Sequence, residues 1–176
     1  MVPNWAQTLS SGCRTRKRGW AMSEPEISRW TQPALPLGLR NLAESARREG
    51  HEFVFRFEAE WLDRTCRFDG PGECLFIARS GQRIVGVSGI CRDPYQQDPD
   101  VGRLRHVYVD AAFRSRGLGR ELVFACLAST GTHFRIIRLK TVNPVAARIY
   151  ERLGFCAVTK DSQSATHVLW RRDATS

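Results

Sequence analysis

The sequence predicts a mixed α/β (α+β) fold, in which helices cover a mostly antiparallel central sheet. Strand-like runs joined by a short turn occupy the middle of the 176-residue chain, and helical patterns alternate with single strands in its C-terminal part. An apolar content of 42% and a charged content of 26% suit one folded domain. No apolar run approaches the ~18 residues that a membrane span needs.

The N-terminal region carries no pattern of a folded element. Residues 1–22 are basic and lack the apolar run of a secretory signal, so we expect a disordered tail, and Met22 offers an alternative start. Residues 23–38 contain three prolines and predict an extended lead-in. We expect a single domain over 39–172 and a short tail at 173–176.

Two helices are predicted after the lead-in. The first ends at Gly50 and is indicated by apolar residues on one helix face, namely Leu39, Leu42, Ala43 and Ala46. The second is indicated by Phe53, Val54, Phe57 and Trp61. A strand is the alternative for this second segment, because its phenylalanines also alternate. The turn at 69–72 then breaks the chain.

The remaining elements alternate in type. Strands are predicted at 74–79, 83–91, 103–109, 134–142, 155–160 and 167–171, with helices at 117–129 and 145–153. The tripeptide Ser80-Gly81-Gln82 indicates a hairpin between the first two of these strands.

Charge and cysteine content narrow the function classes. The net charge is +9, but the densest basic cluster lies within 1–22 and no recognition-helix motif is present, which argues against a nucleic-acid partner. The six cysteines show neither a C-x-x-C pair nor a metal-ligand spacing. We therefore expect no metal, and buried, reduced thiols in a cytoplasmic protein. The cysteines are Cys13, Cys66, Cys74, Cys91, Cys126 and Cys156.

The most informative segment is 107–122, where a strand ends, a turn with two glycines follows and a helix begins. Glycines at a helix N-terminus let the backbone approach a ligand, and the exposed N–H groups and helix dipole favour a phosphate. Arg114 and Arg116 add positive charge. A plain tight turn with solvated arginines would give the same pattern. A dinucleotide-binding turn fits poorly because Leu122 stands where its third glycine would be, and a P-loop is excluded.

This segment resembles the acetyl-CoA signature of the GCN5-related N-acetyltransferase (GNAT) superfamily. The run Arg114-Ser115-Arg116-Gly117-Leu118-Gly119 matches Arg/Gln-x-x-Gly-x-Gly/Ala, and Leu104-x-x-Val107-x-Val109 has the form of the family's fourth strand. Residues 143–155 resemble its Asn-x-x-Ala-x-x-x-Tyr-x-x-x-Gly-Phe segment. The resemblance covers about 103–160 and implies that the fourth and fifth strands splay apart around the thioester. The implied reaction is direct attack of an amine, on a small molecule or a protein, on the acetyl group of acetyl-CoA.

The resemblance also implies roles for particular residues. The main chain of Val107 and Val109 would pair with pantetheine amides. Tyr150 would be the general acid that protonates the CoA sulfur, although its position also suits a core aromatic. Asn143 would contact the cofactor and can cap the helix that Pro144 opens. The implied acetyl-CoA contacts are Val107, Tyr108, Val109, Arg114, Ser115, Arg116, Gly117, Leu118, Gly119, Arg120, Asn143, Ala146 and Tyr150.

The acceptor side is less defined by the sequence. Family members with a base on the fourth strand carry Glu or His on the face that Arg103 and Arg105 occupy here. Two arginines would suit an acceptor with a carboxylate or phosphate, or they are solvated edge charges. By strand alternation, His106 is expected on the opposite face as a structural residue. The sequence does not rank the candidate bases Glu52, Glu58, Glu60, Glu73 and Asp93.

The predicted function is therefore an acetyl-CoA-dependent N-acetyltransferase, with acetyl-CoA as co-substrate and an amine as acceptor. The missing base on the fourth strand keeps one alternative open, a non-catalytic acyl-CoA-binding or regulatory module on the same fold. The presence of Tyr150 favours the enzyme. The sequence leaves the acceptor and the oligomeric state open, a homodimer included, and it indicates no membrane partner.

Overall fold

The computed structural model describes residues 23–159 and 164–171, so the tails expected at 1–22 and 173–176 lie outside the described residues. The strands are β1 (Glu26–Arg29), β2 (Cys74–Ser80), β3 (Arg83–Arg92), β4 (Val101–Val109), β5 (Ile136–Leu139), β6 (Cys156–Ala157) and β7 (His167–Trp170). They form one sheet in the order β1-β2-β3-β4-β5-β7-β6. The β4–β5 pair is parallel and the other pairs are antiparallel, which confirms the mixed, mostly antiparallel sheet.

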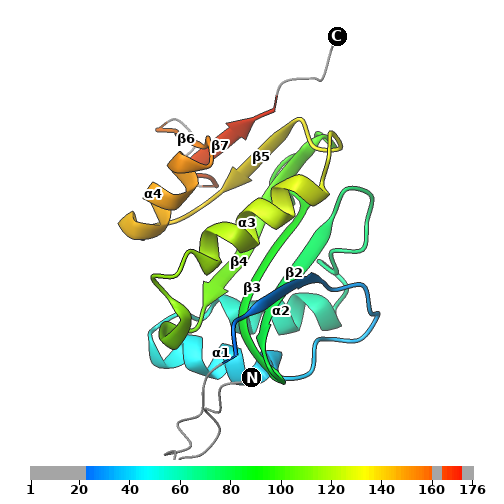
Figure 1. Ribbon diagram of the computed structural model, residues 1–176. Helices are drawn as coiled ribbons and strands as arrows, with labels where there is room; N and C mark the ends of the chain where they lie inside the picture. Colours follow the sequence, from blue (N-terminus) through cyan, green and yellow to red (C-terminus); the bar gives the residue numbers. More distant parts are fainter. Residues whose placement is uncertain (1–22, 160–163, 172–176) are drawn as a thin grey trace, which may run out of the picture.

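Helices cover both faces of this sheet (Figure 1). The helices are α1 (Leu39–Arg48), α2 (Phe53–Leu62), α3 (Leu118–Ser129) and α4 (Pro144–Arg152), with a 3-10 turn η1 (Ala111–Phe113) before α3. Buried residues of α1 and α2 form one apolar cluster on the first face. Buried residues of α3 and α4 share a second cluster on the opposite face. The slot and the turn described below lie between these layers.

The two N-terminal helices follow their predicted apolar spacing. Leu39, Leu42, Ala43 and Ala46 of α1 are all buried against the sheet. The segment that begins at Phe53 is a helix and not the alternative strand. Helical spacing places the rings of Phe57 and Trp61 in the same core, and each buried ring of this size contributes about 2 to 3 kcal/mol through removal from water.

The lead-in contributes a strand that the sequence did not indicate. The predicted extended segment contains β1, which pairs antiparallel with β2 from Glu26 opposite Arg79 to Arg29 opposite Phe76. Strands β5 and β6 are shorter than the predicted 134–142 and 155–160. One reason is that the chain must leave β5 early enough for Asn143 and Pro144 to begin α4.

The two strands at the centre of the sheet separate after three residue pairs. The parallel ladder joins Val101 to Ile136, Gly102 to Ile137 and Arg103 to Arg138. The C-terminal part of β4, residues 104–109, has no ladder partner on β5, and Figure 1 shows the two strands diverging there. This confirms the predicted splay of the fourth and fifth strands.

A β-bulge on β4 corrects one prediction. Val87 of β3 pairs with Tyr108 and Gly89 pairs with Arg105, so two β4 residues, one of them His106, face a single β3 residue. His106 adopts a left-handed φ of 54°. The bulge shifts the alternation by one residue, and the side chains of Arg105 and His106 both contact Glu60 of α2. The prediction that His106 faces away from Arg105 is therefore wrong.

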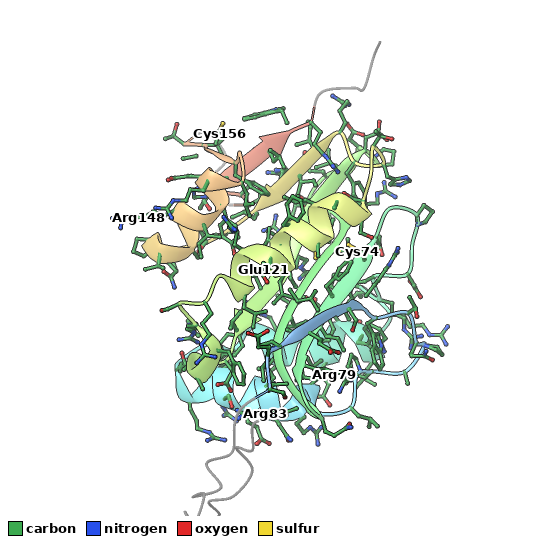
Figure 2. The ribbon with its side chains drawn as sticks, viewed as in Figure 1. Cys74, Arg79, Arg83, Glu121, Arg148 and Cys156 are labelled. Carbon is green, nitrogen blue, oxygen red and sulfur yellow. The ribbon has the colours of Figure 1, made fainter. Side chains whose placement is uncertain are left out.

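The cysteines of the described chain are free thiols. Cys66, Cys74, Cys91 and Cys126 are buried, as expected, whereas Cys156 on β6 is exposed (Figure 2). A two-residue strand at the sheet edge offers too little cover to bury it. Among the helices of the described residues, none has both the length and the apolar content to cross a membrane.

Candidate functional site

The turn between β4 and α3 has the backbone shape of an open helix N-terminus. Ser115 and Gly117 adopt left-handed φ values of 64° and 83°, and Gly117 is the N-cap of α3. No described side chain caps this helix. The amide of Glu121 donates to the Gly117 carbonyl oxygen at 3.1 Å, which leaves the preceding amides at the open end. The sequence predicted this arrangement.

Gly119 is not required by the packing of the described residues. A Cβ atom there would lie 3.6 Å from Cγ2 of Val109, an ordinary contact, and the residue does not have a left-handed φ. Gly117 differs, because its φ of +83° strains any other residue. The protein itself therefore has room for a side chain at Gly119, and a ligand bound beside the turn would be needed to exclude one.

Arg114 connects this turn to α1 instead of pointing freely into solvent. Its Nε donates to the Val109 carbonyl oxygen at 2.9 Å, and its Nη2 lies 2.7 Å from Oε2 of Glu49. The hydroxyl of Tyr108 donates to the other oxygen of Glu49 at 2.9 Å. Burial and this hydrogen bond raise the pKa of Tyr108 to about 12. Desolvation raises the pKa of Glu49, but the hydrogen bonds from Arg114 and Tyr108 outweigh it, so the net pKa is lowered.

The other residues of the predicted phosphate turn differ in exposure. Ser115, Arg116 and Arg120 are exposed, while Leu118 is buried under the sheet face that α3 covers. Arg116 and Arg120 thus present exposed guanidinium groups beside the partly exposed Arg114, and the large apolar side chain of Leu118 anchors α3.

Helix α4 begins as the sequence predicted. Oδ1 of Asn143 accepts hydrogen bonds from the amides of Val145 at 2.9 Å and Ala146 at 3.3 Å, and Pro144 occupies the first helical position. A cap of this kind stabilises a helix by about 1 kcal/mol. Ala146 and Tyr150 of the same helix pack into the cluster that lines the α3 face.

Tyr150 is mostly buried, but its hydroxyl keeps some accessible surface, because no fully buried polar side-chain atom of the described residues lacks a hydrogen-bond partner. Its residue surface is 7% exposed, its ring lies 5.9 Å from that of Phe155, and no hydrogen bond joins its hydroxyl to a described residue. Burial raises the pKa of Tyr150 to about 12. The phenol therefore stays protonated near neutral pH and can donate a hydrogen bond to a group that enters beside α4.

The unpaired segment of β4 carries the other predicted contacts. Val107 and Val109 direct their side chains into the clusters on the α3 face, and Tyr108 packs on the α1 side. Their main-chain groups on the side of β5 lie beyond the last ladder pair. The carbonyl oxygen of Val109 already accepts from Nε of Arg114, and the groups there that have no such bond need another partner, which can be a ligand with amides.

One carboxylate lies beside the bulge, and it belongs to α2. Oε1 of Glu60 accepts from Nη2 of Arg105 at 2.6 Å, and Oε2 lies 3.0 Å from Nε2 of His106. The His106 ring packs edge-on against Phe57 at 5.0 Å. Burial raises the pKa of Glu60, but the His106 hydrogen bond and the charges of Arg105 and His106 outweigh it, so the net pKa is lowered. Glu60 is therefore ionised at neutral pH.

The other candidate bases lie elsewhere or are occupied. Glu58 pairs with Arg40 at 2.9 Å, and Glu73 accepts from the amides of Gly70 and Arg92. Asp93 is fully buried and Glu52 is exposed at the start of α2. Of the five candidates, Glu60 is thus the one that the described structure brings to the β4 bulge.

A half-open cavity of about 400 Å³ adjoins this α2 side. Arg105 lines it together with polar side chains that include Thr65, Glu73 and Gln96. No group of His, Cys, Asp and Glu side chains among residues 23–159 and 164–171 could hold a metal ion.

Sequence reasoning missed the residues that act over long sequence separations. Glu49 meets Tyr108 across 59 positions, and Ser164 meets Arg103 across 61. No spacing rule links such pairs. The left-handed φ of His106 likewise has no signal in a run of residues that alternates regularly.

Comparisons with known proteins agree with this geometry. Residues 37–155 match the sequence profile of the acetyltransferase (GNAT) family. A mycothiol acetyltransferase of Thermobispora bispora is 30% identical over 193 residues, which cover 97% of this chain and 63% of that protein. An uncharacterized protein of Mycobacterium leprae is 30% identical over 86 residues, 47% of this chain and 23% of that protein. The chain thus spans less than two thirds of the length of the curated relatives it matches.

Solved structures share the fold. One from Exiguobacterium sp. 255-15 has a TM-score of 0.72 at 24% identity, with 84% of this chain and 93% of that chain covered. A GNAT family N-acetyltransferase from Escherichia coli, solved in complex with CoA, has a TM-score of 0.62 at 17% identity, with 85% and 82% covered. At these identities the likeness concerns the fold alone. Because the family's profile matches more than half of the sequence, the chain belongs to the acetyltransferase (GNAT) family.

Proposed function

We propose that this chain is an acetyl-CoA-dependent N-acetyltransferase whose single domain spans 39–172. Family membership supports the proposal, as do the mycothiol acetyltransferase relative and the family member solved with CoA. The observation that carries it is one juxtaposition. The open N-terminus of α3 follows, after the η1 turn, the β4 segment that has no β5 partner.

Main-chain groups do most of the cofactor binding in this proposal. The amide of Arg114 already donates to the Ala111 carbonyl oxygen at 3.3 Å. The amides of 115–120 therefore hold the pyrophosphate at the positive end of α3, and exposed Arg116 and Arg120 add charge. The main chain of Val107 and Val109 pairs with the pantetheine amides as an added strand would. Asn143 and Ala146 border the same slot from α4. Arg114 contributes indirectly, because its ion pair with Glu49 holds the turn in place.

Tyr150 is the proposed partner of the leaving sulfur, and its pKa decides whether it acts as the general acid that the resemblance implies or as a hydrogen-bond donor. Its pKa of about 12 lies above the ordinary thiol value of ~8.5. Complete proton transfer to a free thiolate would therefore cost roughly 5 kcal/mol. The hydroxyl instead donates a hydrogen bond that strengthens as negative charge builds on sulfur, and this is the differential binding that accelerates a reaction.

Glu60 and His106 are the proposed acceptor-side groups. The lowered pKa of Glu60 makes it a weak base, so its carboxylate attracts the cationic form of the amine and orients His106. The His106 ring, held by Glu60, is the proposed acceptor of the amine's proton. The cavity beside Arg105 has a polar lining and favours a hydrophilic acceptor.

We also propose a cytoplasmic location for the protein. The free thiols of the described chain support a reducing compartment such as the cytoplasm, since disulfides persist mainly outside it. The homodimer stays a prediction.

Calorimetric titration of the full chain with acetyl-CoA, beside adenine nucleotides and NAD, tests the proposal. We expect acetyl-CoA to bind at least about tenfold more tightly than the others, because only acetyl-CoA occupies both turn and slot. If acetyl-CoA did not bind, or bound no more tightly than the adenine nucleotides and NAD, the proposed function would be overturned.

A screen of amines by thiol release then separates the enzyme from the non-catalytic module. One observation favours the non-catalytic module. Arg103 stands on the face of β4 where other family members carry a base, and its guanidinium group is paired with Asp93. Selective binding without thiol release for any amine class would support the module.

A further inference from the structure

The last residue pair that joins β4 to β5 consists of two arginines. Arg103 lies opposite Arg138, and the parallel ladder ends with this pair. Like charges on paired strand positions destabilise a sheet. Both side chains are nevertheless buried, with 9% and 6% of their surfaces exposed. The point where the two strands separate is therefore a place where they would repel each other without a counter-charge.

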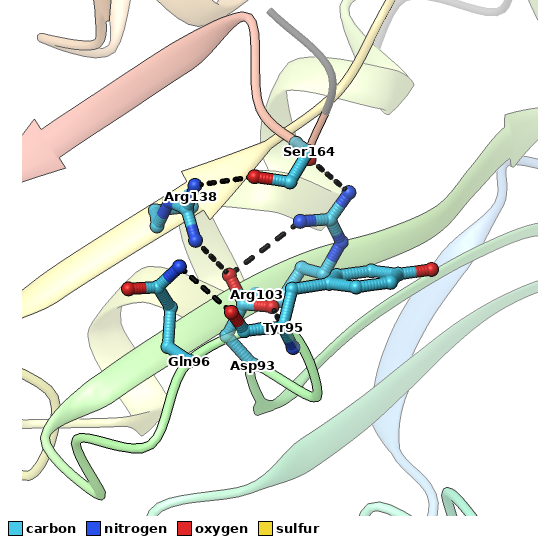
Figure 3. Close-up of polar contacts among 6 residues, drawn as sticks. All are labelled: Asp93, Tyr95, Gln96, Arg103, Arg138 and Ser164. Carbon is cyan, nitrogen blue, oxygen red and sulfur yellow. Dashed lines mark hydrogen bonds and ion pairs between the residues drawn. The ribbon is translucent and has the colours of Figure 1, made fainter. Parts of the chain in front are cut away.

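Asp93 places a carboxylate between these two guanidinium groups (Figure 3). Its Oδ2 accepts from Nη1 of Arg138 at 3.0 Å and lies 3.5 Å from Nη1 of Arg103. Its Oδ1 accepts from the amide of Tyr95 at 3.0 Å, and its own amide donates to the Val101 carbonyl oxygen at 2.8 Å. With no exposed surface, Asp93 is held in one position by the loop that connects β3 to β4.

Ser164 closes the arrangement from the other side. Nη2 of Arg103 donates to the Ser164 carbonyl oxygen at 2.7 Å, and Nη2 of Arg138 donates to its hydroxyl at 2.8 Å. The ring of Tyr95 lies 4.8 Å from the Arg103 guanidinium and covers it. We call the four residues Asp93, Arg103, Arg138 and Ser164 the fork clamp.

We propose that Asp93 is a positioning residue that fixes where β4 and β5 separate and thereby sets the width of the slot between them. The inference rests on the proposed function, which places the pantetheine arm in that slot. Without the carboxylate, Arg103 and Arg138 are two buried cations side by side, and breaking such buried pairs is strongly unfavourable. The strands then part before this pair, and the main chain of 104–109 loses its spacing from β5.

The same contacts give Arg103 a different role from the one its sequence position suggested. Its guanidinium is engaged by Asp93, Ser164 and the ring of Tyr95, so it acts in the fork clamp and not as a ligand for an acceptor carboxylate.

Asp93→Asn tests this proposal with two ligands. Calorimetry measures the Kd of acetyl-CoA and of 3′-phosphoadenosine 5′-diphosphate, which carries the pyrophosphate but no pantetheine arm. We expect acetyl-CoA to bind about tenfold more weakly while the nucleotide changes less than about twofold, because only the arm occupies the slot. Loss of both affinities in equal measure, or no loss of acetyl-CoA affinity, would overturn the proposal.

A matched control and a rescue sharpen the test. Asp98→Asn removes an exposed carboxylate on the same loop, which pairs with Arg135 at 3.1 Å, and should change neither Kd. Combining Asp93→Asn with Arg103→Gln removes one cation with the anion and should restore acetyl-CoA affinity to within about threefold of the wild type. A double variant as weak as the single one would contradict charge repulsion as the cause.

A second variant covers the case in which Asp93→Asn does not fold. Ser164→Ala removes only the hydroxyl that accepts from Arg138, and we expect a selective loss of about threefold in acetyl-CoA affinity. If Ser164→Ala bound both acetyl-CoA and 3′-phosphoadenosine 5′-diphosphate as the wild type does, the result would count against the fork clamp. Failure of the wild type to bind acetyl-CoA at all would instead refute the proposed function.

Discussion

The two sides of β4 are built from different kinds of interaction. On the α3 side, the candidate cofactor site consists of main-chain groups and small residues around Gly117 and Gly119. On the α2 side, the site consists of ion pairs such as Glu60 with Arg105, whose members lie 45 residues apart. The first side depends on local backbone shape and the second on the tertiary fold. Substitutions should therefore fail for different reasons on the two sides.

The largest effect is expected on the main-chain side, at Gly119. Gly119→Asp places a negative side chain beside the proposed pyrophosphate, so acetyl-CoA affinity should fall more than about a thousandfold, or roughly 4 kcal/mol. Titration calorimetry measures the loss, and Gly119→Ala is the graded partner because the free protein has room for its Cβ atom. Wild-type affinity in Gly119→Asp would refute the phosphate turn.

The second effect concerns the hydroxyl of Tyr150. Tyr150→Phe keeps the ring contact with Phe155 and removes only the hydrogen-bond donor, so kcat should fall about hundredfold with little change in acetyl-CoA Kd. Thiol release with an amine found in the screen gives kcat. Tyr95→Phe, at an exposed site, is the control. A full kcat in the Tyr150 variant would remove the proposed role of its hydroxyl on the leaving sulfur.

The smallest effect is expected on the ion-pair side, at Glu60. Because the pKa of Glu60 is lowered, the ionised carboxylate stabilises the fold above its ordinary pKa of ~4.3, and this stability is lost as pH falls through the lower, folded value. Glu60→Gln should therefore reduce Tm by about 3 °C at pH 7, with the difference from wild type shrinking towards pH 3.

Glu58→Gln is the matched control for that variant. Glu58 lies on the same helix with nearly the same exposure, 21% against 20% for Glu60, but it pairs with the exposed Arg40. We expect its Tm to change by less than about 1 °C. Equal effects of the two substitutions would show that the contacts of Glu60 at the bulge are not special.

The contrast between the two sides also explains what the sequence could predict. The turn before α3, the cap at Asn143 and the splay of the strands depend on short motifs, and the structure has all three. The helix at Phe53 followed from apolar spacing in the same way. Short-range geometry is encoded in neighbouring residues, so a motif carries it.

The acceptor side could not be predicted because its partners meet only after folding. The five candidate carboxylates look alike in sequence, and only packing of α2 against the sheet brings Glu60 to His106. Burial of Asp93 likewise depends on arginines from two strands and on Ser164. Strand β1 escaped prediction because its pairing partner lies some 50 residues later in the chain.

The bulge at His106 shifts the two-residue alternation of side chains along β4 by one position. Counting every second residue from Arg103 would group it with Arg105 and Val107, yet Arg105 and its neighbour His106 both contact Glu60 of α2, and Val107 packs on the α3 side. An alignment or a mutant library that ignores the extra residue would exchange the two faces beyond this point. Attempts to change acceptor preference should therefore vary Arg105 and His106 together as neighbours on one wall and leave Val107, which belongs to the opposite wall, untouched.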